Sequence, residues 1–274
     1  MDQYEPHRWR NGIFDILIQM YNLNEFKKVA LDATQKASER IMYYFQNLPK
    51  IETKIDKTPV TKADREAEEI IISTIKKTFP SHGFLGEEFG SDKEDAEFTW
   101  IVDPIDGTKN FIHGLSFFGT ILSLRYQGNI ILGISNMPAI GELLYASEEE
   151  KTTLNGKPTH VSQIQRLEDS FVNFNPSKFE NEKYLSIVKA VDKRVINMRG
   201  FGDTYGYHLV ATGRAEVFFE IGPKAWDISA FQIIMKQAGG KYSNFEENEY
   251  ALGGTSLATN GLLHEEMLRI IKNS

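Results

Sequence analysis

The sequence of 274 residues contains no cysteine. Disulfide bonds, thiolate nucleophiles and zinc sites with cysteine ligands are therefore excluded. Basic residues are outnumbered, with 31 Lys and Arg against 38 Asp and Glu, and the formal net charge of −7 argues against a basic face for nucleic acid. An apolar stretch at residues 13–20 is interrupted by Asp15, is too short to span a bilayer and lacks the form of a signal peptide. We therefore expect a cytoplasmic protein that acts on neither nucleic acid nor a membrane.

Hydrophobic residues make up 41% of the chain, which is enough to bury a sizeable core. Apolar residues recur at steps of three and four from Phe26 to Tyr44, and this spacing predicts an amphipathic helix. A second helix is predicted to follow Thr61, which forms a capping-box pattern with Asp64, and to end before Pro80.

A strand-rich block comes next, and strands and helices alternate in the last third of the chain. Strands are expected at residues 100–102, 117–126, 130–135, 143–146, 171–174, 195–198 and 216–220. Helices are expected at residues 183–191, 205–211, 226–238 and 264–272. This order predicts sheets layered between helices in a single unit of residues 1–274, with sub-halves at about 25–165 and 166–274.

Two carboxylates flank a proline where the strand at residues 100–102 ends. Pro104 favours an extended turn, so Asp103 and Asp106 lie about one turn apart and can bracket a hard cation such as Mg²⁺. An alternative interpretation makes Asp103 a turn residue and Asp106 a helix N-cap. Gly107 and Thr108 then offer backbone N–H groups for an anion, or a simple helix cap.

Three further acidic residues have equally ambiguous settings. Glu87 lies in a glycine-flanked loop, where it can bind a metal or be a solvated loop residue. Asp227 is either a metal ligand or the N-cap of its helix, and Asp64 is most simply the acid of its capping box. No single one of these positions establishes a site, and the inference depends on their joint occurrence.

Five motifs follow one another along the chain: Val60-Thr-Lys-Ala-Asp64, Gly86-Glu-Glu, Trp100-Ile-Val-Asp-Pro-Ile-Asp-Gly-Thr-Lys-Asn-Phe111, Leu154-Asn-Gly-Lys-Pro-Thr-His-Val-Ser162, and Trp226-Asp227 with Ala238-Gly-Gly240. In this order they resemble the inositol monophosphatase family over roughly residues 25–270. The resemblance implies an αβαβα layered sandwich with mixed sheets and a homodimer. It also implies Mg²⁺-dependent, lithium-sensitive hydrolysis of a small phosphate monoester by a metal-activated water.

The same resemblance implies a role for each acidic residue, with two or three Mg²⁺ ions bound. Glu87, Asp103 and the carbonyl of Ile105 would bind the first ion, and Asp103, Asp106 and Asp227 the second. A third, weaker ion would bind near Glu87.

The remaining implied roles concern phosphate and water. Gly107 and Thr108 would hold the substrate phosphate by their backbone N–H groups. Thr108 and Glu87 would activate the attacking water, while Asp64 orients the Thr108 hydroxyl.

The substrate is less determined, and the implied substrate-binding residues are Asp106, Asp203, Thr204, Glu220 and Asp227. The segment 202–205 resembles the histidinol-phosphate branch of the family, in which Asp203 and Glu220 can bind a protonated amine. The segment 110–113 looks more like the inositol branch, and Asp203 has an alternative role as a helix N-cap. Inositol monophosphate and histidinol phosphate are therefore both expected substrates. A 3′(2′),5′-bisphosphate nucleotidase and a non-catalytic sugar-phosphate sensor remain as alternatives.

Overall fold

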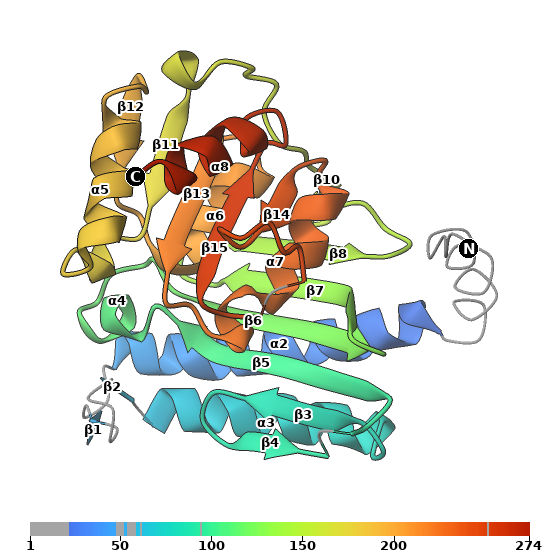
Figure 1. The fold of residues 1–274 in the computed structure, drawn as a ribbon. Coiled ribbons are helices and arrows are strands. Elements are labelled where there is room, and N and C mark those ends of the chain that lie inside the picture. Colours follow the sequence, from blue (N-terminus) through green and yellow to red (C-terminus); the bar gives the residue numbers. More distant parts are fainter. Residues whose placement is uncertain (1–21, 48–51, 54–58, 61, 94, 251) are drawn as a thin grey trace, which may run out of the picture.

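The computed structural model describes residues 22–274 apart from 48–51, 54–58, 61, 94 and 251. Helices and sheets alternate in five layers, as Figure 1 shows. The predicted αβαβα arrangement with mixed sheets is therefore confirmed. Within the described residues, no helix combines the length and the apolar character needed to cross a bilayer. The capping box expected at Thr61 lies outside the described residues, as does the stretch at residues 13–20.

The first layer consists of two helices, α2 (Leu23–Gln46) and α3 (Lys62–Thr78). Both follow the predicted periodicity, with buried stripes that include Ala30, Ala37 and Ile41 in α2 and Ile71 in α3. These stripes pack on one face of the larger sheet, because a helix with one apolar face must cover it with another element. A short antiparallel pair, β1 (Glu52–Thr53) and β2 (Pro59–Val60), lies between the two helices in the chain.

The larger sheet has eight strands in the order β10-β9-β8-β7-β6-β5-β3-β4, and all neighbours are antiparallel except β3 and β5. Its strands are β3 (Gly83–Gly86), β4 (Gly90–Asp92), β5 (Phe98–Asp106), β6 (Gly119–Tyr126), β7 (Asn129–Met137), β8 (Glu142–Ser147), β9 (Thr153–Leu154) and β10 (Lys157–Pro158). Asn155 and Gly156 form the tight turn between β9 and β10. The short helix α4 (Thr108–Ile112) follows β5 directly.

Helices α6 (Asp203–Ala211) and α7 (Ala225–Gln237) form the middle layer, between the two sheets. The smaller sheet has the order β12-β11-β13-β15-β14. Its strands are β11 (Phe171–Phe174), β12 (Asn197–Arg199), β13 (Val217–Ile221), β14 (Lys241–Ser243) and β15 (Thr255–Thr259). Helices α5 (Glu182–Asp192) and α8 (His264–Lys272) cover its outer face. Two single 3₁₀ turns, η1 (Leu167–Asp169) and η2 (Pro176–Lys178), flank β11.

The structure differs from the expected elements mainly around β5. The strand was expected to end at Val102, yet it continues through Pro104 to Asp106. The register with β6 shifts between Asp103 and Asp106, so the proline, which has no N–H group to donate, lies in an irregular part of the ladder. Strands β3, β4, β14 and β15 were not predicted, because three to five residues carry too little alternation to stand out.

Candidate active site

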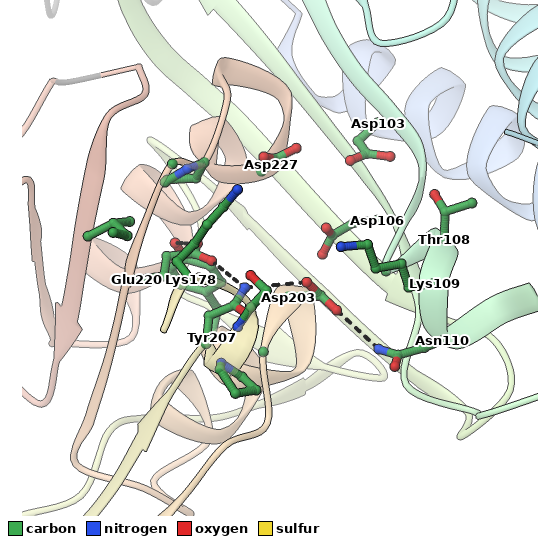
Figure 2. A pocket seen from close by; sticks show the side chains of 18 of the residues that line it. Asp103, Asp106, Thr108, Lys109, Asn110, Lys178, Asp203, Tyr207, Glu220 and Asp227 are labelled. Atoms are coloured by element: carbon green, nitrogen blue, oxygen red, sulfur yellow. Dashed lines mark hydrogen bonds between the residues drawn. The ribbon is translucent and has the colours of Figure 1, made fainter. Parts of the chain in front are cut away.

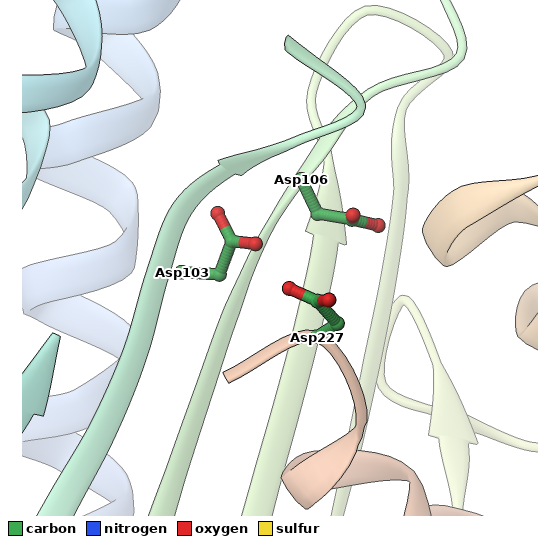
Figure 3. Close-up of side chains that lie close together, drawn as sticks. All are labelled: Asp103, Asp106 and Asp227. Atoms are coloured by element: carbon green, nitrogen blue, oxygen red, sulfur yellow. The ribbon is translucent and has the colours of Figure 1, made fainter. Parts of the chain in front are cut away.

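Three aspartates converge where β5 ends and α7 begins. Asp103 and Asp106 come from the irregular end of β5, and Asp227 from the first turn of α7. One carboxylate oxygen from each lies within 4.8 Å of the others, and Figure 3 shows the three side chains pointing toward one another. The register shift in β5 is what allows two residues only three apart to point into one space.

The protein compensates the charges of this cluster only in part. No described residue donates a hydrogen bond to Oδ1 of Asp103, although this atom is buried. Burial, and then repulsion from Glu87 and the neighbouring aspartates, raises the pKa of Asp103 well above its usual range. Burial and the nearby Asp203 raise the pKa of Asp106 in the same way. Because buried like charges cannot all ionise without a partner, the donor set fits a hard divalent cation with oxygen ligands.

Glu87 lies in the turn between β3 and β4 and faces the same cavity. Its N–H donates to the carbonyl of Val102 over 3.2 Å, which holds the turn against β5. The buried carboxylate of Glu68, on α3, accepts the N–H groups of Glu88 (2.9 Å) and Phe89 (3.1 Å). The turn that carries Glu87 is thus anchored on both sides.

The start of α4 supplies the hydroxyl and backbone groups. Gly107 has φ +82° and is the N-cap of this helix, and an added Cβ there would lie 2.9 Å from the carbonyl oxygen of Phe117. Oγ1 of Thr108 lies 2.9 Å from the carbonyl oxygen of Ile105 and 3.4 Å from Oδ1 of the buried Asp64. The hydroxyl therefore has two acceptors within reach, one of them the carboxylate expected to orient it.

These groups line one cavity of about 420 Å³ (Figure 2). Six acidic side chains and two lysines line it: Glu87, Asp103, Asp106, Asp203, Glu220 and Asp227, with Lys109 and Lys178. Two of the six carboxylates, those of Asp203 and Glu220, lie outside the group formed by Glu87 and the three clustered aspartates. Asp203 and Glu220 therefore form a second acidic group within the same cavity.

Asn175 joins the two carboxylates of this second group. Its Nδ2 donates to Oε2 of Glu220 over 3.0 Å and lies 3.5 Å from Oδ1 of Asp203. Asn110 donates to the other oxygen of Asp203 over 3.0 Å, and the hydroxyl of Tyr207 donates to Glu220 over 2.7 Å. Burial raises the pKa of Glu220 to about 8, so a cationic ligand here would favour its ionised form.

The interpretation of Asp203 as a helix N-cap is wrong, because α6 begins at Asp203 itself and Gly202 occupies the cap position. Asp106 does not cap α4 either, since Gly107 does, and its Oδ2 instead accepts the N–H of Thr204 at the start of α6. Asp227 is not the N-cap of α7 either, because Lys224 occupies the cap position and Asp227 is the third helical residue. It lies in the aspartate cluster, and its Oδ2 accepts the N–H of Lys224 over 2.7 Å.

Thr204 differs from the other expected substrate-binding residues. Its side chain is fully buried, and its hydroxyl is bonded to that of Ser135 over 2.6 Å. Thr204 is not among the described residues that line the cavity. It contacts the site through its backbone N–H, which donates to Oδ2 of Asp106.

Sequence reasoning did not find Glu68, Asn175 or Lys178. Glu68 lies four residues after Asp64 on the buried face of α3, and an acid in an otherwise apolar stripe was a usable signal. Asn175 and Lys178 belong to no motif, and only the approach of β11 to β13 brings them to the cavity.

A sequence model of the inositol monophosphatase family matches residues 22–274. A histidinol-phosphatase of Chlorobaculum parvum is 36% identical over 251 residues, which cover 90% of this chain and 96% of that protein. A histidinol-phosphatase of Mycobacterium tuberculosis is 32% identical, over 88% of this chain and 95% of that protein. A fructose-1,6-bisphosphatase/inositol-1-monophosphatase of Thermotoga maritima is 33% identical, over 86% and 92%.

Solved structures give the same result. The extragenic suppressor protein SuhB of Bartonella henselae superposes with a TM-score of 0.86 at 30% identity, covering 91% of this chain and 99% of that one. The Thermotoga maritima IMPase superposes with a TM-score of 0.83, also at 30% identity, covering 91% and 97%.

Proposed function

Because the chain belongs to the inositol monophosphatase family, we propose that it hydrolyses a small phosphate monoester in this cavity with the help of Mg²⁺. It is a phosphoric monoester hydrolase, as its relatives named histidinol-phosphatase and inositol-1-monophosphatase are. The observation that carries the proposal is the convergence of Asp103, Asp106 and Asp227 within 4.8 Å, with a buried Asp103 oxygen to which no described residue donates.

The acidic residues of the cavity would bind the metal ions in two overlapping sets. Glu87, Asp103 and the carbonyl of Ile105 would hold one Mg²⁺, and Asp103, Asp106 and Asp227 a second. A bound divalent cation supplies a Lewis acid that activates water and neutralises phosphoryl charge. A third, weaker ion near Glu87 and inhibition by Li⁺ belong to the same proposal.

Phosphate and water are oriented by the start of α4 and its neighbours. The backbone N–H groups of Gly107 and Thr108 would donate hydrogen bonds to the phosphate oxygens. Glu87 and Oγ1 of Thr108 would accept hydrogen bonds from the attacking water and so orient it toward the phosphorus. For this the Thr108 hydroxyl donates to Oδ1 of Asp64, 3.4 Å away. The leaving alkoxide takes its proton from a neighbouring water.

For the leaving group, the second acidic group favours a substrate with a protonated amine, and we propose histidinol phosphate. Asp203 and Glu220 provide two carboxylates outside the aspartate cluster, and an ammonium ion satisfies them better than neutral hydroxyls do. The curated relatives named histidinol-phosphatase agree with this choice. Inositol monophosphate is the second candidate, because Glu220 and Asp227 can also accept hydrogen bonds from ring hydroxyls. A 3′(2′),5′-bisphosphate nucleotide is third.

A phosphate-release screen with Mg²⁺ tests the proposal, with histidinol phosphate, inositol 1-phosphate and adenosine 3′,5′-bisphosphate as substrates. We expect turnover that disappears with a chelator and is fastest with histidinol phosphate. Absence of Mg²⁺-dependent phosphate release from all three would contradict the proposed function.

The variant Asp203→Asn tests the amine site, because it removes the charge and keeps the size of the side chain. Losing a charge-assisted hydrogen bond costs about 1.5–3 kcal/mol, so we expect kcat/KM for histidinol phosphate to fall about 10- to 100-fold. Turnover of inositol 1-phosphate should change little and serves as the internal control. An equal fall for both substrates would show that Asp203 acts only through the structure.

We also propose that the protein is a homodimer, as the resemblance implies, and that it is cytoplasmic, as expected from its sequence. Light scattering of the purified protein would test the first. Calorimetric titration with Mg²⁺ would count the bound ions.

A further inference from the structure

We propose that a buried hydrogen-bond chain made of Thr204, Ser135, His208 and Glu142, here called the His208 chain, fixes the orientation of the Asp106 carboxylate. This inference rests on the proposed function, because it concerns Asp106 as a metal ligand. The four residues are positioning residues, since none of them is among the described residues that line the cavity.

The contacts run without a gap from Asp106 through the middle layer of the fold. The Thr204 N–H donates to Oδ2 of Asp106, and Oγ1 of Thr204 lies 2.6 Å from Oγ of Ser135. Oγ of Ser135 lies 2.9 Å from Nε2 of His208, and Nδ1 of His208 lies 3.2 Å from Oε2 of Glu142. Thr204, Ser135 and His208 are fully buried, so water does not compete for these bonds.

The outer end of the chain is held by an ion pair. Both terminal nitrogens of Arg214 donate to Glu142, over 2.7 and 2.6 Å. Although burial opposes it, the hydrogen bonds from His208 and Arg214 lower the pKa of Glu142 to about 2. Glu142 is therefore ionised at neutral pH and can only accept hydrogen bonds.

Because Glu142 can only accept, the donor and the acceptor of each hydrogen bond in the His208 chain are determined. Nδ1 of His208 must carry the proton that faces Glu142, and burial lowers the pKa of His208, so the ring is neutral and Nε2 accepts. Ser135 then donates to Nε2 and accepts from the Thr204 hydroxyl. The Thr204 hydroxyl is thereby directed away from Asp106, and only its N–H faces the carboxylate.

Close packing leaves Thr204 little freedom to move. Gly119 of β6 pairs with Asp106 in the sheet, and a Cβ built on this glycine would lie 3.1 Å from Cγ2 of Thr204. A change in the His208 chain must therefore be transmitted to the Thr204 N–H and so to the carboxylate it holds. Residues that orient metal ligands in this way typically change metal affinity 10- to 100-fold when mutated.

The test compares the Mg²⁺ affinity of the full chain and its variants by calorimetry. Ser135→Ala and Thr204→Val each remove one hydroxyl from the chain, and we expect both to weaken Mg²⁺ binding about 10-fold. Thr204→Ser keeps the hydroxyl and should retain more of the wild-type affinity than Thr204→Val does. Thr152→Val is the matched control, because Thr152 is equally buried but its hydroxyl donates to the carbonyl of Ile234 over 2.7 Å.

Melting temperatures separate positioning from general destabilisation. Thr152→Val and Thr204→Val should both melt at a lower temperature than the wild type, yet Thr152→Val should bind Mg²⁺ like the wild type. Equal Mg²⁺ affinity in Ser135→Ala, Thr204→Val and the wild type would overturn the inference. If the wild type itself bound no Mg²⁺, the proposed function would fail with it. Glu142→Gln provides a second test if a buried variant does not fold, because Glu142 is partly exposed at the outer end of the His208 chain. The glutamine amide can rotate and so no longer presents only an acceptor to His208. This variant should therefore also weaken Mg²⁺ binding.

Discussion

Asp103 lies buried among like charges, with one oxygen to which no described residue donates. In the proposed site the Asp103 carboxylate would bind two ions. Without metal, the same carboxylate destabilises the folded state. The same residue is therefore expected to favour activity and oppose stability, as is common where function requires a strained environment.

The variant Asp103→Asn separates these two effects. We expect kcat to fall at least about 100-fold, because charge stabilisation at the reacting group is lost. The metal-free protein should become more stable by about 1 kcal/mol or more, since a buried group that repels its neighbours is replaced by a neutral one. Phosphate release and thermal melting measure the two quantities.

Asp169→Asn is the control for that experiment, because Asp169 is exposed on η1 and its ion pair with Arg166 contributes little. It should leave both activity and melting unchanged. Wild-type turnover in Asp103→Asn would remove the basis for the metal assignment.

Among the elements, the turn between β3 and β4 depends most directly on another element for its position. Helix α3 supplies Glu68, whose carboxylate accepts two N–H groups from the residues that follow Glu87. Gly86 makes this approach possible, since a Cβ there would lie 1.9 Å from Oε1 of Glu68.

The variant Gly86→Ala should therefore displace Glu68 and release the turn. Overpacking at a buried position costs about 1–3 kcal/mol, and we expect weaker Mg²⁺ binding in addition because Glu87 moves. Urea unfolding and calorimetry measure the two effects.

Gly90→Ala is the matched control at the other end of the same turn. Gly90 has φ +71° and open space around it, so alanine there adds only backbone strain of about 1–2 kcal/mol. A similar loss of Mg²⁺ affinity in both variants would indicate that the turn itself, and not the Glu68 contact, determines the position of Glu87.

At the scale of the whole molecule, buried carboxyl groups in and beside the acidic cavity make the stability of the fold depend on pH. Burial raises the pKa of Glu68 to about 7 and that of Glu220 to about 8. Between an ordinary carboxyl pKa and these values, the folded state binds more protons than the unfolded state. Stability therefore falls as pH rises through this range.

We expect the metal-free protein to lose about 1–2 kcal/mol between pH 7 and pH 8.5, or roughly 3–6 °C in melting temperature. Glu220→Gln should reduce this dependence. An unchanged slope in that variant would show that another group is responsible.

Mg²⁺ should stabilise the folded protein more as pH rises, because its carboxylate ligands must be deprotonated to bind it. At 100 times its dissociation constant we expect a gain of about 2.7 kcal/mol, and a larger shift at pH 8.5 than at pH 7. Melting curves at both pH values, with Mg²⁺ and with a chelator, would measure this.

The sequence by itself determined the long periodic helices, the four long strands of the larger sheet and the set of acidic residues to consider. These features are local, because an amphipathic stripe or a hairpin turn is determined by a few neighbouring residues. Asp103 and Asp106 likewise lie on one strand. The family motifs then indicated Glu87 and Asp227 as partners of that pair.

Only the tertiary structure decided which residues surround those acids. Asn175 reaches Asp203 across β11 and α6, Glu68 reaches the Glu87 turn from α3, and Ser135 meets His208 between β7 and α6. The irregular register that points Asp103 and Asp106 into one cavity is also set by pairing with β6. Each of these contacts joins residues far apart in the chain, so it depends on sheet register and layer packing, which no local pattern specifies.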